Sequence, residues 1–220
     1  MVVRLHDVSH RFGKRWVLAR LTLALSEGKT TLLTGENGAG KTTLLRLLAT
    51  AMAPTRGRLE VFGSSLPADL ASVRARIGIV THENYLYGAL SAWENLMLVA
   101  RLRGFPRGQE RVLRLEGLLQ HVGLGSHAHR SVGGFSAGMK RRLCFARLLL
   151  CQPALALLDE PFAQLDPDGV RLVEALIQEL QEKNTTIVLS THDVDRGLCI
   201  ADFHMALAAG RLRGSIEEVR

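Results

Sequence analysis

The strongest chemical signal in the sequence is GENGAGKTT at residues 35–43. It fits the pattern G-x-x-x-x-G-K-[ST] at every position, after a short apolar strand and before a leucine-rich helix. Glycines let main-chain N–H groups wrap phosphate oxygens, and the helix N-terminus adds positive charge. We expect Lys41 to reach the outer phosphates and Thr42 to ligate Mg²⁺. The predicted phosphate loop comprises Gly35, Glu36, Asn37, Gly38, Ala39, Gly40, Lys41, Thr42 and Thr43.

Two further strands are expected to end in reactive side chains beside this loop. ALALLDEP at 154–161 is apolar up to Asp159 and Glu160, and IVLSTHD at 187–193 delivers His192. Ligands of open parallel sheets gather at the carboxyl ends of the strands. Asp159 would hold Mg²⁺, and Glu160 could polarise an attacking water. His192 could contact the outermost phosphate and hold that water in place.

A second loop of small residues, GGFSAGMKRR at 133–142, opens another helix. Ser136 suits the helix N-cap position, and the loop could form a second anion site. Because the chain already has one phosphate loop, the second one suggests a nucleotide held by another subunit. A simple helix cap is the alternative interpretation.

Strands and helices alternate around these motifs, which favours a parallel sheet covered on both faces. Hydrophobic periodicity predicts three successive helices at 92–102, 110–122 and 136–150. We therefore expect residues 83–152 to form a helical lobe inserted into a single domain. Residues 1–82 and 153–220 would form its β and nucleotide-binding core.

Composition limits the class of protein. The chain has 220 residues, of which 47% are hydrophobic, enough for one packed domain. No stretch approaches the roughly 18 apolar residues of a membrane span, and the N-terminus lacks the apolar core of a signal peptide. A cytoplasmic location is expected.

Three cysteines without CxxC spacing predict buried free thiols. The net charge of +7 indicates solvated helix faces or a docking surface for a membrane partner.

In order and spacing, the motifs resemble the nucleotide-binding subunit of an ATP-binding cassette (ABC) transporter over essentially the whole chain. GENGAGKT matches the Walker A motif, LALLDEP the Walker B motif, FSAGM loosely the LSGGQ signature, FAQLD at 162–166 the D-loop, and His192 the switch histidine. Phe12 falls where the family keeps an aromatic residue that stacks on adenine. The resemblance implies an α/β fold: a P-loop NTPase (RecA-like) core with an N-terminal antiparallel β subdomain and an inserted α-helical subdomain.

The same resemblance implies a head-to-tail homodimer with ATP and Mg²⁺ at its interface. The signature residues Ser136, Ala137 and Gly138 would bind the nucleotide of the partner subunit, and Asp166 of the D-loop would lie at the nucleotide. Two positions depart from the family pattern. Phe135 replaces the usual leucine, and Met139 replaces a glutamine, which removes a polar group near the partner's ribose.

His82 stands where the family usually has the glutamine of the Q-loop. That position implies contact with Mg²⁺ or the attacking water, and a link from the nucleotide to the helical lobe. Histidine here, the following NYLYGALSAWENL and the S-A-G signature together resemble the ATP-binding subunit of the haem exporter of cytochrome c maturation (CcmA). Small export cassettes for drugs or antibiotics share the short length and a similar segment. A chance replacement without subfamily meaning is the third alternative.

The resemblance therefore implies an ATP hydrolase that drives separate integral membrane permease subunits, peripheral at the inner face of the cell membrane. A soluble ABC ATPase acting on ribosomes or DNA usually carries two cassettes or a long coiled-coil insertion, and this chain has neither. A phosphate-loop kinase or GTPase fits less well, because no NKxD segment is present and an adjacent Asp–Glu pair favours hydrolysis. No nucleic-acid partner is expected.

Overall fold

The N-terminal residues form an antiparallel sheet in the computed structural model, which describes residues 1–65, 70–214 and 216–219. Strands β1 (Val3–Phe12), β2 (Arg15–Leu25), β4 (Arg56–Val61) and β5 (Ser64–Ser65) pair in the order β2-β1-β4-β5. The chain turns at Gly13. Both strands of the hairpin continue up to that turn, and the pairing of β1 with β2 has register shifts between Leu5 and Arg11.

A second sheet forms the centre of the molecule. It comprises β3 (Thr30–Thr34), β6 (Ile77–Val80), β7 (Leu155–Asp159), β8 (Thr186–Ser190), β9 (Phe203–Ala208), β10 (Arg211–Leu212) and β11 (Glu217–Glu218). The strand order is β10-β9-β3-β8-β7-β6, and β11 also pairs with β9. All pairs from β9 to β6 are parallel, so the carboxyl ends of these strands share one edge.

Successive residues of the parallel strands point into different hydrophobic cores, as the period-2 geometry of a strand requires. Leu32 and Leu158 belong to one core, and their neighbours Leu33 and Leu157 to the other. The first core packs the helices α3 (Ala92–Leu102), α4 (Gln109–His121), α5 (Ala137–Cys151) and α6 (Pro167–Glu182). The second core packs α1 (Lys41–Leu48) and the N-terminal strands. The sheet is covered on both faces, as predicted.

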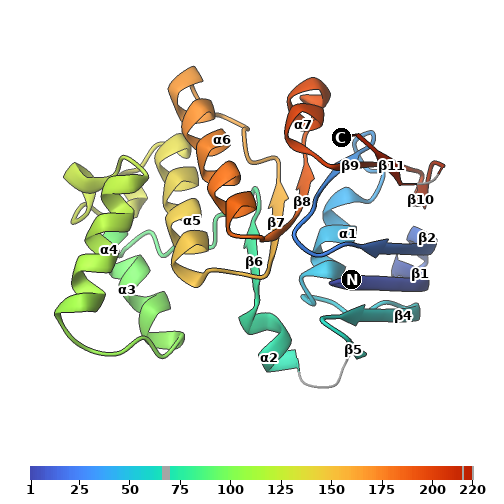
Figure 1. Ribbon diagram of the computed structural model, residues 1–220, viewed down its shortest axis with the longest axis horizontal. Coiled ribbons are helices and arrows are strands. Elements are labelled where there is room, and N and C mark those ends of the chain that lie inside the picture. The colour runs from blue at the N-terminus through green and yellow to red at the C-terminus, as the bar shows by residue number, and fades with distance from the viewer. Residues whose placement is uncertain (66–69, 215, 220) are drawn as a thin grey trace.

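Three helices form a block at one end of the molecule, opposite the N-terminal strands (Figure 1). They are α3 (Ala92–Leu102), α4 (Gln109–His121) and α5 (Ala137–Cys151), with 3₁₀ turns at Gly125–His127 and Val132–Gly134. Ser91 and Glu94 form a capping box at the start of α3, and the Ser136 hydroxyl caps α5. The helix predictions for this region are confirmed to within a residue or two.

The remaining helices are α6 (Pro167–Glu182), α7 (Val194–Ile200) and the short α2 (Leu70–Ala75), which the sequence did not predict. All three cysteines are free, but the prediction that all are buried is wrong: Cys144 is buried, Cys151 partly exposed and Cys199 exposed. Cys199 lies on the outer side of the seven-residue helix α7. No helix within the described residues has the length and apolarity needed to cross a bilayer.

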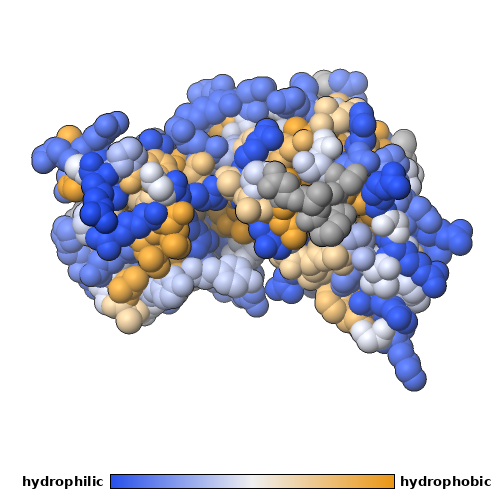
Figure 2. Space-filling view, turned by 90° about the horizontal axis from the view of Figure 1, so that it is seen from below, coloured by the Kyte–Doolittle hydropathy of each residue, from blue (hydrophilic) through white to orange (hydrophobic). Residues whose placement is uncertain are grey.

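One face of the molecule is hollowed between the helical block and the strands, with apolar side chains exposed in the hollow (Figure 2). A groove of about 320 Å³ lies between α3, α5 and β6. Ile77, Ile79, Val99 and Leu148 contribute its apolar surface, and Arg103 and Arg147 add positive charge.

Candidate nucleotide site

A cavity of about 510 Å³ opens at the carboxyl ends of β3, β6, β7 and β8. Strand register brings the motifs together there, since Ser190 of β8 pairs with both Leu33 of β3 and Asp159 of β7. The sequence-predicted residues that line the cavity are Glu36, Asn37, Gly38, Gly40, Lys41, Thr42, Thr43, His82, Asp159, Glu160 and His192. Its volume lies within the usual range for small-molecule sites, about 300–1,000 Å³.

The phosphate loop connects β3 to α1 and needs glycine for its shape. Gly35 has φ 146°, and a Cβ atom there would lie 2.2 Å from the carbonyl oxygen of Leu207. Gly40 has φ 107° and precedes α1 without a side-chain cap. The first N–H groups of a helix have no partner within it, so those of α1 are available to an anion.

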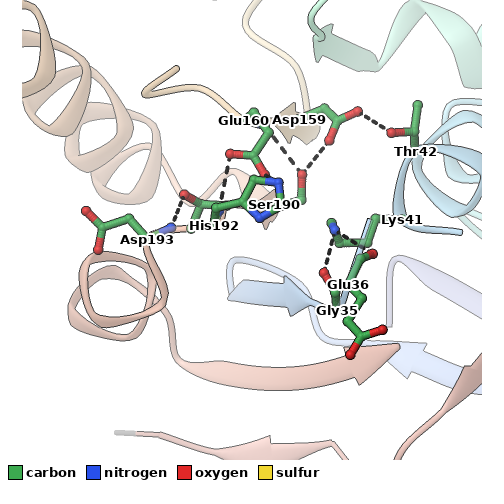
Figure 3. Close-up of polar contacts among 10 residues, drawn as sticks. Gly35, Glu36, Lys41, Thr42, Asp159, Glu160, Ser190, His192 and Asp193 are labelled. Carbon is green, nitrogen blue, oxygen red and sulfur yellow. Dashed lines mark hydrogen bonds and ion pairs between the residues drawn. The ribbon is translucent and has the colours of Figure 1, made fainter. Parts of the chain in front are cut away.

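Lys41 braces this loop from within (Figure 3). Its side chain is 8% exposed, and Nζ donates to the carbonyl oxygens of Gly35 at 2.6 Å and Glu36 at 3.2 Å. Because the ammonium has three donors, it can hold the loop and still offer a proton to a phosphate oxygen.

The Asp159 carboxylate joins the phosphate loop to the strand ends. Oδ2 accepts a hydrogen bond from the Thr42 hydroxyl at 2.8 Å, and Oδ1 accepts one from the Ser190 hydroxyl at 2.5 Å (Figure 3). The residue is 6% exposed. A threonine hydroxyl and a carboxylate, 117 positions apart in the chain, thus form a pair of hard oxygen donors at the cavity wall.

Glu160 turns out of the strand with φ 50°, a left-handed conformation that is uncommon for residues other than glycine. Oε2 accepts from the main-chain N–H of His192 at 3.2 Å. Oε1 is buried and makes no hydrogen bond with the described residues, although Nε2 of His192 lies 3.3 Å away. Burial raises the pKa of the Glu160 carboxyl, against the opposing effects of the His192 contacts. The site therefore holds one carboxylate oxygen with spare capacity to accept a proton.

Seven further predicted residues do not line this cavity. Phe12 lies at the end of β1, is 51% exposed and contacts the His10 ring edge-on at a centroid distance of 4.8 Å. Ser136, Ala137 and Gly138 lie at the start of α5, and Asp166 caps α6 by accepting from the Gly169 N–H at 2.7 Å. Gly35 and Ala39 belong to the phosphate loop but are not on the cavity wall.

Sequence reasoning missed four residues of the site. Arg15 and Val17 of β2 and Ala163 after Glu160 line the cavity, and Ser190 holds Asp159. Ser190 could have been found, because it ends the strand that delivers His192. Arg15 and Val17 lie outside the elements that the sequence predicts, so the face of β2 that they share was not recognisable.

The sheet edge, the glycine loop and the strand-end carboxylates define a P-loop NTPase site. A family profile described as ABC transporter matches residues 18–163, and the chain belongs to this family. Its ATP-binding subunits bind and hydrolyse ATP, which is the activity of this chain.

Curated relatives match nearly the whole chain. The chain is 32% identical to the ABC transporter ATP-binding protein NatA of Bacillus subtilis, over 99% of this chain and 91% of the relative. It is 35% identical to the bacitracin transport ATP-binding protein BcrA of Bacillus licheniformis, over 87% of this chain and 61% of that protein. It is 34% identical to the Nod factor export ATP-binding protein I of Rhizobium etli, over 97% of this chain and 69% of that protein.

Solved structures agree on the fold. An ATP-binding subunit of an ABC transporter has a TM-score of 0.90 and 28% identity, covering 99% of this chain and 90% of that one. A dimeric ATP-binding cassette in a post-hydrolysis state, bound to ADP and Pi, also has a TM-score of 0.90, with 26% identity and 99% coverage of both chains. The predicted fold class, an α/β P-loop core with an antiparallel β subdomain, is confirmed.

Proposed function

We propose that the chain hydrolyses ATP at the cavity described above and thereby drives export through separate membrane subunits. The observation that carries the proposal is the Thr42–Asp159 contact, which joins the phosphate loop to the strand-end carboxylates in one cavity. In this proposal Lys41 and the loop N–H groups bind the outer phosphates of ATP. Phe12 would stack on the adenine from the exposed end of β1.

The oxygen donors beside the phosphate loop fit Mg²⁺. No group of three or more His, Cys, Asp or Glu side chains in the described ranges could hold a metal alone. Mg²⁺ is usually held by one or two protein oxygens together with water and substrate phosphates, which matches Thr42 and Asp159. The ion would neutralise phosphate charge when bound.

Glu160 is the proposed general base. Its Oε1 accepts no hydrogen bond from the described residues, which supports this role, because a base needs an oxygen that can still accept the proton of the attacking water. His192, within 3.3 Å of that oxygen, would orient the same water and contact the outermost phosphate. His82 lines the cavity and would contact the water or the ion.

Two subunits would act together, with ATP between the phosphate loop of one and the start of α5 of the other. Ser136, Ala137 and Gly138 lie outside the cavity of their own chain, which is what contact in trans requires. Asp166 would lie at the same interface. Similarity to a dimeric cassette with bound ADP and Pi supports this arrangement.

Integral membrane permease subunits are the proposed partners, which would keep the chain at the inner face of the membrane. The segment from His82 to Tyr87 connects the cavity to the apolar groove beside α3 and α5, and Tyr85 is 62% exposed there. Movement at the nucleotide could pass to a membrane subunit through this segment.

Export of drug- or antibiotic-type molecules is the substrate assignment that the relatives favour, because one of them is named for bacitracin transport and another for Nod factor export. An import protein, the phosphonates import ATP-binding protein PhnC of Frankia casuarinae, is 35% identical over 96% of this chain. Haem export is the second candidate. It rests on His82 and the following NYLYGALSAWENL.

The ATP-dependent dimer provides the test of this function. Glu160→Gln protein should bind Mg²⁺-ATP and accumulate as a dimer in size-exclusion chromatography, because the ATP that holds the interface is not consumed. Wild-type protein under the same conditions should be mainly monomeric after turnover. A variant that stays monomeric with saturating Mg²⁺-ATP would contradict the proposed dimer.

A further inference from the structure

One helix, α5, holds the main chain on both sides of His82. Arg141 Nη1 donates to the carbonyl oxygen of Thr81 at 3.0 Å, and Arg147 Nη1 donates to that of Tyr85 at 3.0 Å. Between them, the Cys144 thiol contacts the main-chain and side-chain oxygens of Asn84 at 3.5 and 3.6 Å. The three donors are spaced by three residues, so they share one side of the helix.

The His82 side chain has no such support of its own. It is exposed at the cavity wall and makes no hydrogen bond or ion pair with any residue in the described part of the chain. Its position is therefore set by the main chain that carries it. The carbonyl group of Thr81, the residue before His82, is held by the hydrogen bond from Arg141.

Arg141 is unusual because its guanidinium is buried. The residue is 4% exposed and Thr81 is 9% exposed, whereas arginine is almost never fully buried without a partner. Burial lowers the pKa of the Arg141 guanidinium, while nearby charges, including those of Asp159 and Glu160, raise it. Arginine stays protonated in proteins, and a hydrogen bond from a charged donor is about twice as strong as a neutral one.

Strand pairing places this contact beside the proposed catalytic carboxylates. Val80, the last residue of β6, pairs with Leu158 of β7. The residues that follow in the two strands, Thr81 and Asp159, are therefore neighbours at the sheet edge. Thr81 immediately precedes His82. A donor that holds the Thr81 carbonyl therefore also holds the main chain of His82 relative to Asp159 and Glu160.

We propose that Arg141 is a positioning residue for ATP hydrolysis, which fixes His82 relative to the Asp159–Glu160 pair by binding the Thr81 carbonyl. The inference rests on the proposed role of His82 at the attacking water. Arg141 lies five residues after Ser136 on the same helix. The proposed partner-binding loop and the main chain of His82 are thus attached to one rigid element.

A double-mutant cycle on the full chain tests this assignment. Arg141→Met should lower kcat for ATP hydrolysis by about 10- to 100-fold, the scale expected when a reacting group is displaced by about 1 Å. KM and the calorimetric affinity for ATP should stay unchanged, because the phosphate loop is untouched. Arg141→Lys, which keeps the charge and a donor, should recover part of the lost kcat. Arg101→Met on the exposed side of α3 is the matched control and should behave as wild type.

The decisive comparison is made in a His82→Ala background. If Arg141 acts through His82, then His82→Ala/Arg141→Met should be no slower than His82→Ala alone. If Arg141→Met lowers kcat in the His82→Ala background by the same factor as in the wild-type protein, the assignment is overturned. If His82→Ala by itself leaves kcat at the wild-type value, the proposed role of His82 fails, a result distinct from a failure of Arg141. Should Arg141→Met not fold, Arg141→Lys carries the same comparison with a smaller fall.

Discussion

Glu160 and Asp159 are adjacent in sequence, but their surroundings differ. Both oxygens of Asp159 accept hydroxyl hydrogen bonds, whereas Glu160 has one buried oxygen without a hydrogen bond. The Asp159 carboxylate is held in place by two hydroxyl groups, which suits a metal ligand. A carboxyl with an oxygen that accepts no hydrogen bond and with a raised pKa, as in Glu160, suits a proton acceptor. The different roles that we propose for the two residues follow from these surroundings.

Substitution of Glu160 by glutamine should lower the rate of ATP hydrolysis by about 10²–10⁴-fold, which is the usual contribution of a positioned base. ATP affinity should be retained, since glutamine has nearly the same shape. The measurement is steady-state phosphate release together with calorimetric ATP binding. Glu116→Gln on the exposed side of α4 is the control for loss of a carboxylate. Near-normal hydrolysis by the Glu160 variant would exclude this residue as the base.

Lys41→Ala should abolish detectable ATP binding. The substitution removes the cation that faces the phosphates, and it also removes the two hydrogen bonds that brace the loop at Gly35 and Glu36. Isothermal titration with ATP measures the effect, and Lys29→Ala, at an exposed position just before β3, is the control. Wild-type affinity in the Lys41 variant would show that the phosphates bind elsewhere.

At the scale of elements, α4 and α6 are joined by an ionic cluster around Glu179. Its carboxylate meets His121 Nε2 at 2.8 Å and Lys183 Nζ at 2.5 Å. Burial alone would raise the pKa of Glu179, but the hydrogen bonds from Lys183 and His121 outweigh it and lower the pKa. A carboxyl with a lowered folded-state pKa stabilises the fold above its unfolded pKa, about 4.3, and this contribution is lost as pH falls through the folded-state value.

Glu179→Gln should therefore lower Tm at pH 7 by about 1–3 °C, the scale of a partly exposed ion pair of less than about 1 kcal/mol. The difference from wild type should shrink as the pH falls below about 4.3 and vanish once the pH lies below the folded-state pKa of Glu179, where both proteins carry a neutral group. Thermal unfolding followed by circular dichroism at several pH values measures this. A difference in Tm that is independent of pH would show that Glu179 acts by packing and not by charge.

Much of the fold is predictable from local signals. The capping serines Ser91 and Ser136, the apolar runs of β7 and β8, and the glycines around α1 each mark an element boundary. The phosphate loop and the strand-end carboxylates were predicted for the same reason, because each lies within a few residues of its own element. Their meeting in one cavity follows from the general rule for parallel strands.

Other features depend on contacts between distant parts of the chain and leave no local signal. Arg141 and Thr81 are 60 positions apart, and nothing near either residue indicates the hydrogen bond between them. Arg15 and Val17 face the cavity because β2 continues through an irregular hairpin. The exposure of Cys199 follows from the side of α7 on which it falls, which its apolar neighbours did not reveal.

At the scale of the whole molecule, we predict that each ATP in the dimer is bound by residues of both subunits. Lys41→Ala and Ser136→Arg proteins should each be inactive, one by loss of phosphate binding and the other by blocking the interface. In a mixture, a heterodimer would combine the intact Lys41 of one chain with the intact Ser136 of the other. ATP hydrolysis should therefore reappear on mixing. Absence of recovery, with heterodimers detected by native mass spectrometry, would contradict contact in trans.

The choice between the two export candidates belongs to the membrane subunits and can be tested with the assembled complex. Complex reconstituted in lipid vesicles should hydrolyse ATP faster when its substrate is present. Stimulation by bacitracin and not by haem is the expected result, because one relative is named for bacitracin transport. Stimulation by haem alone would reverse the order of the two candidates.

The most direct test of the account is the recovery of tagged protein from gently solubilised native membranes, with its partners identified by mass spectrometry. Co-purification of a multi-span membrane protein, retained in the Glu160→Gln variant with ATP, is the expected result. Small membrane proteins of haem export among the partners would favour the haem candidate. Recovery with ribosomes or DNA, and without any integral membrane protein, would contradict the central claim that this ATPase drives transport.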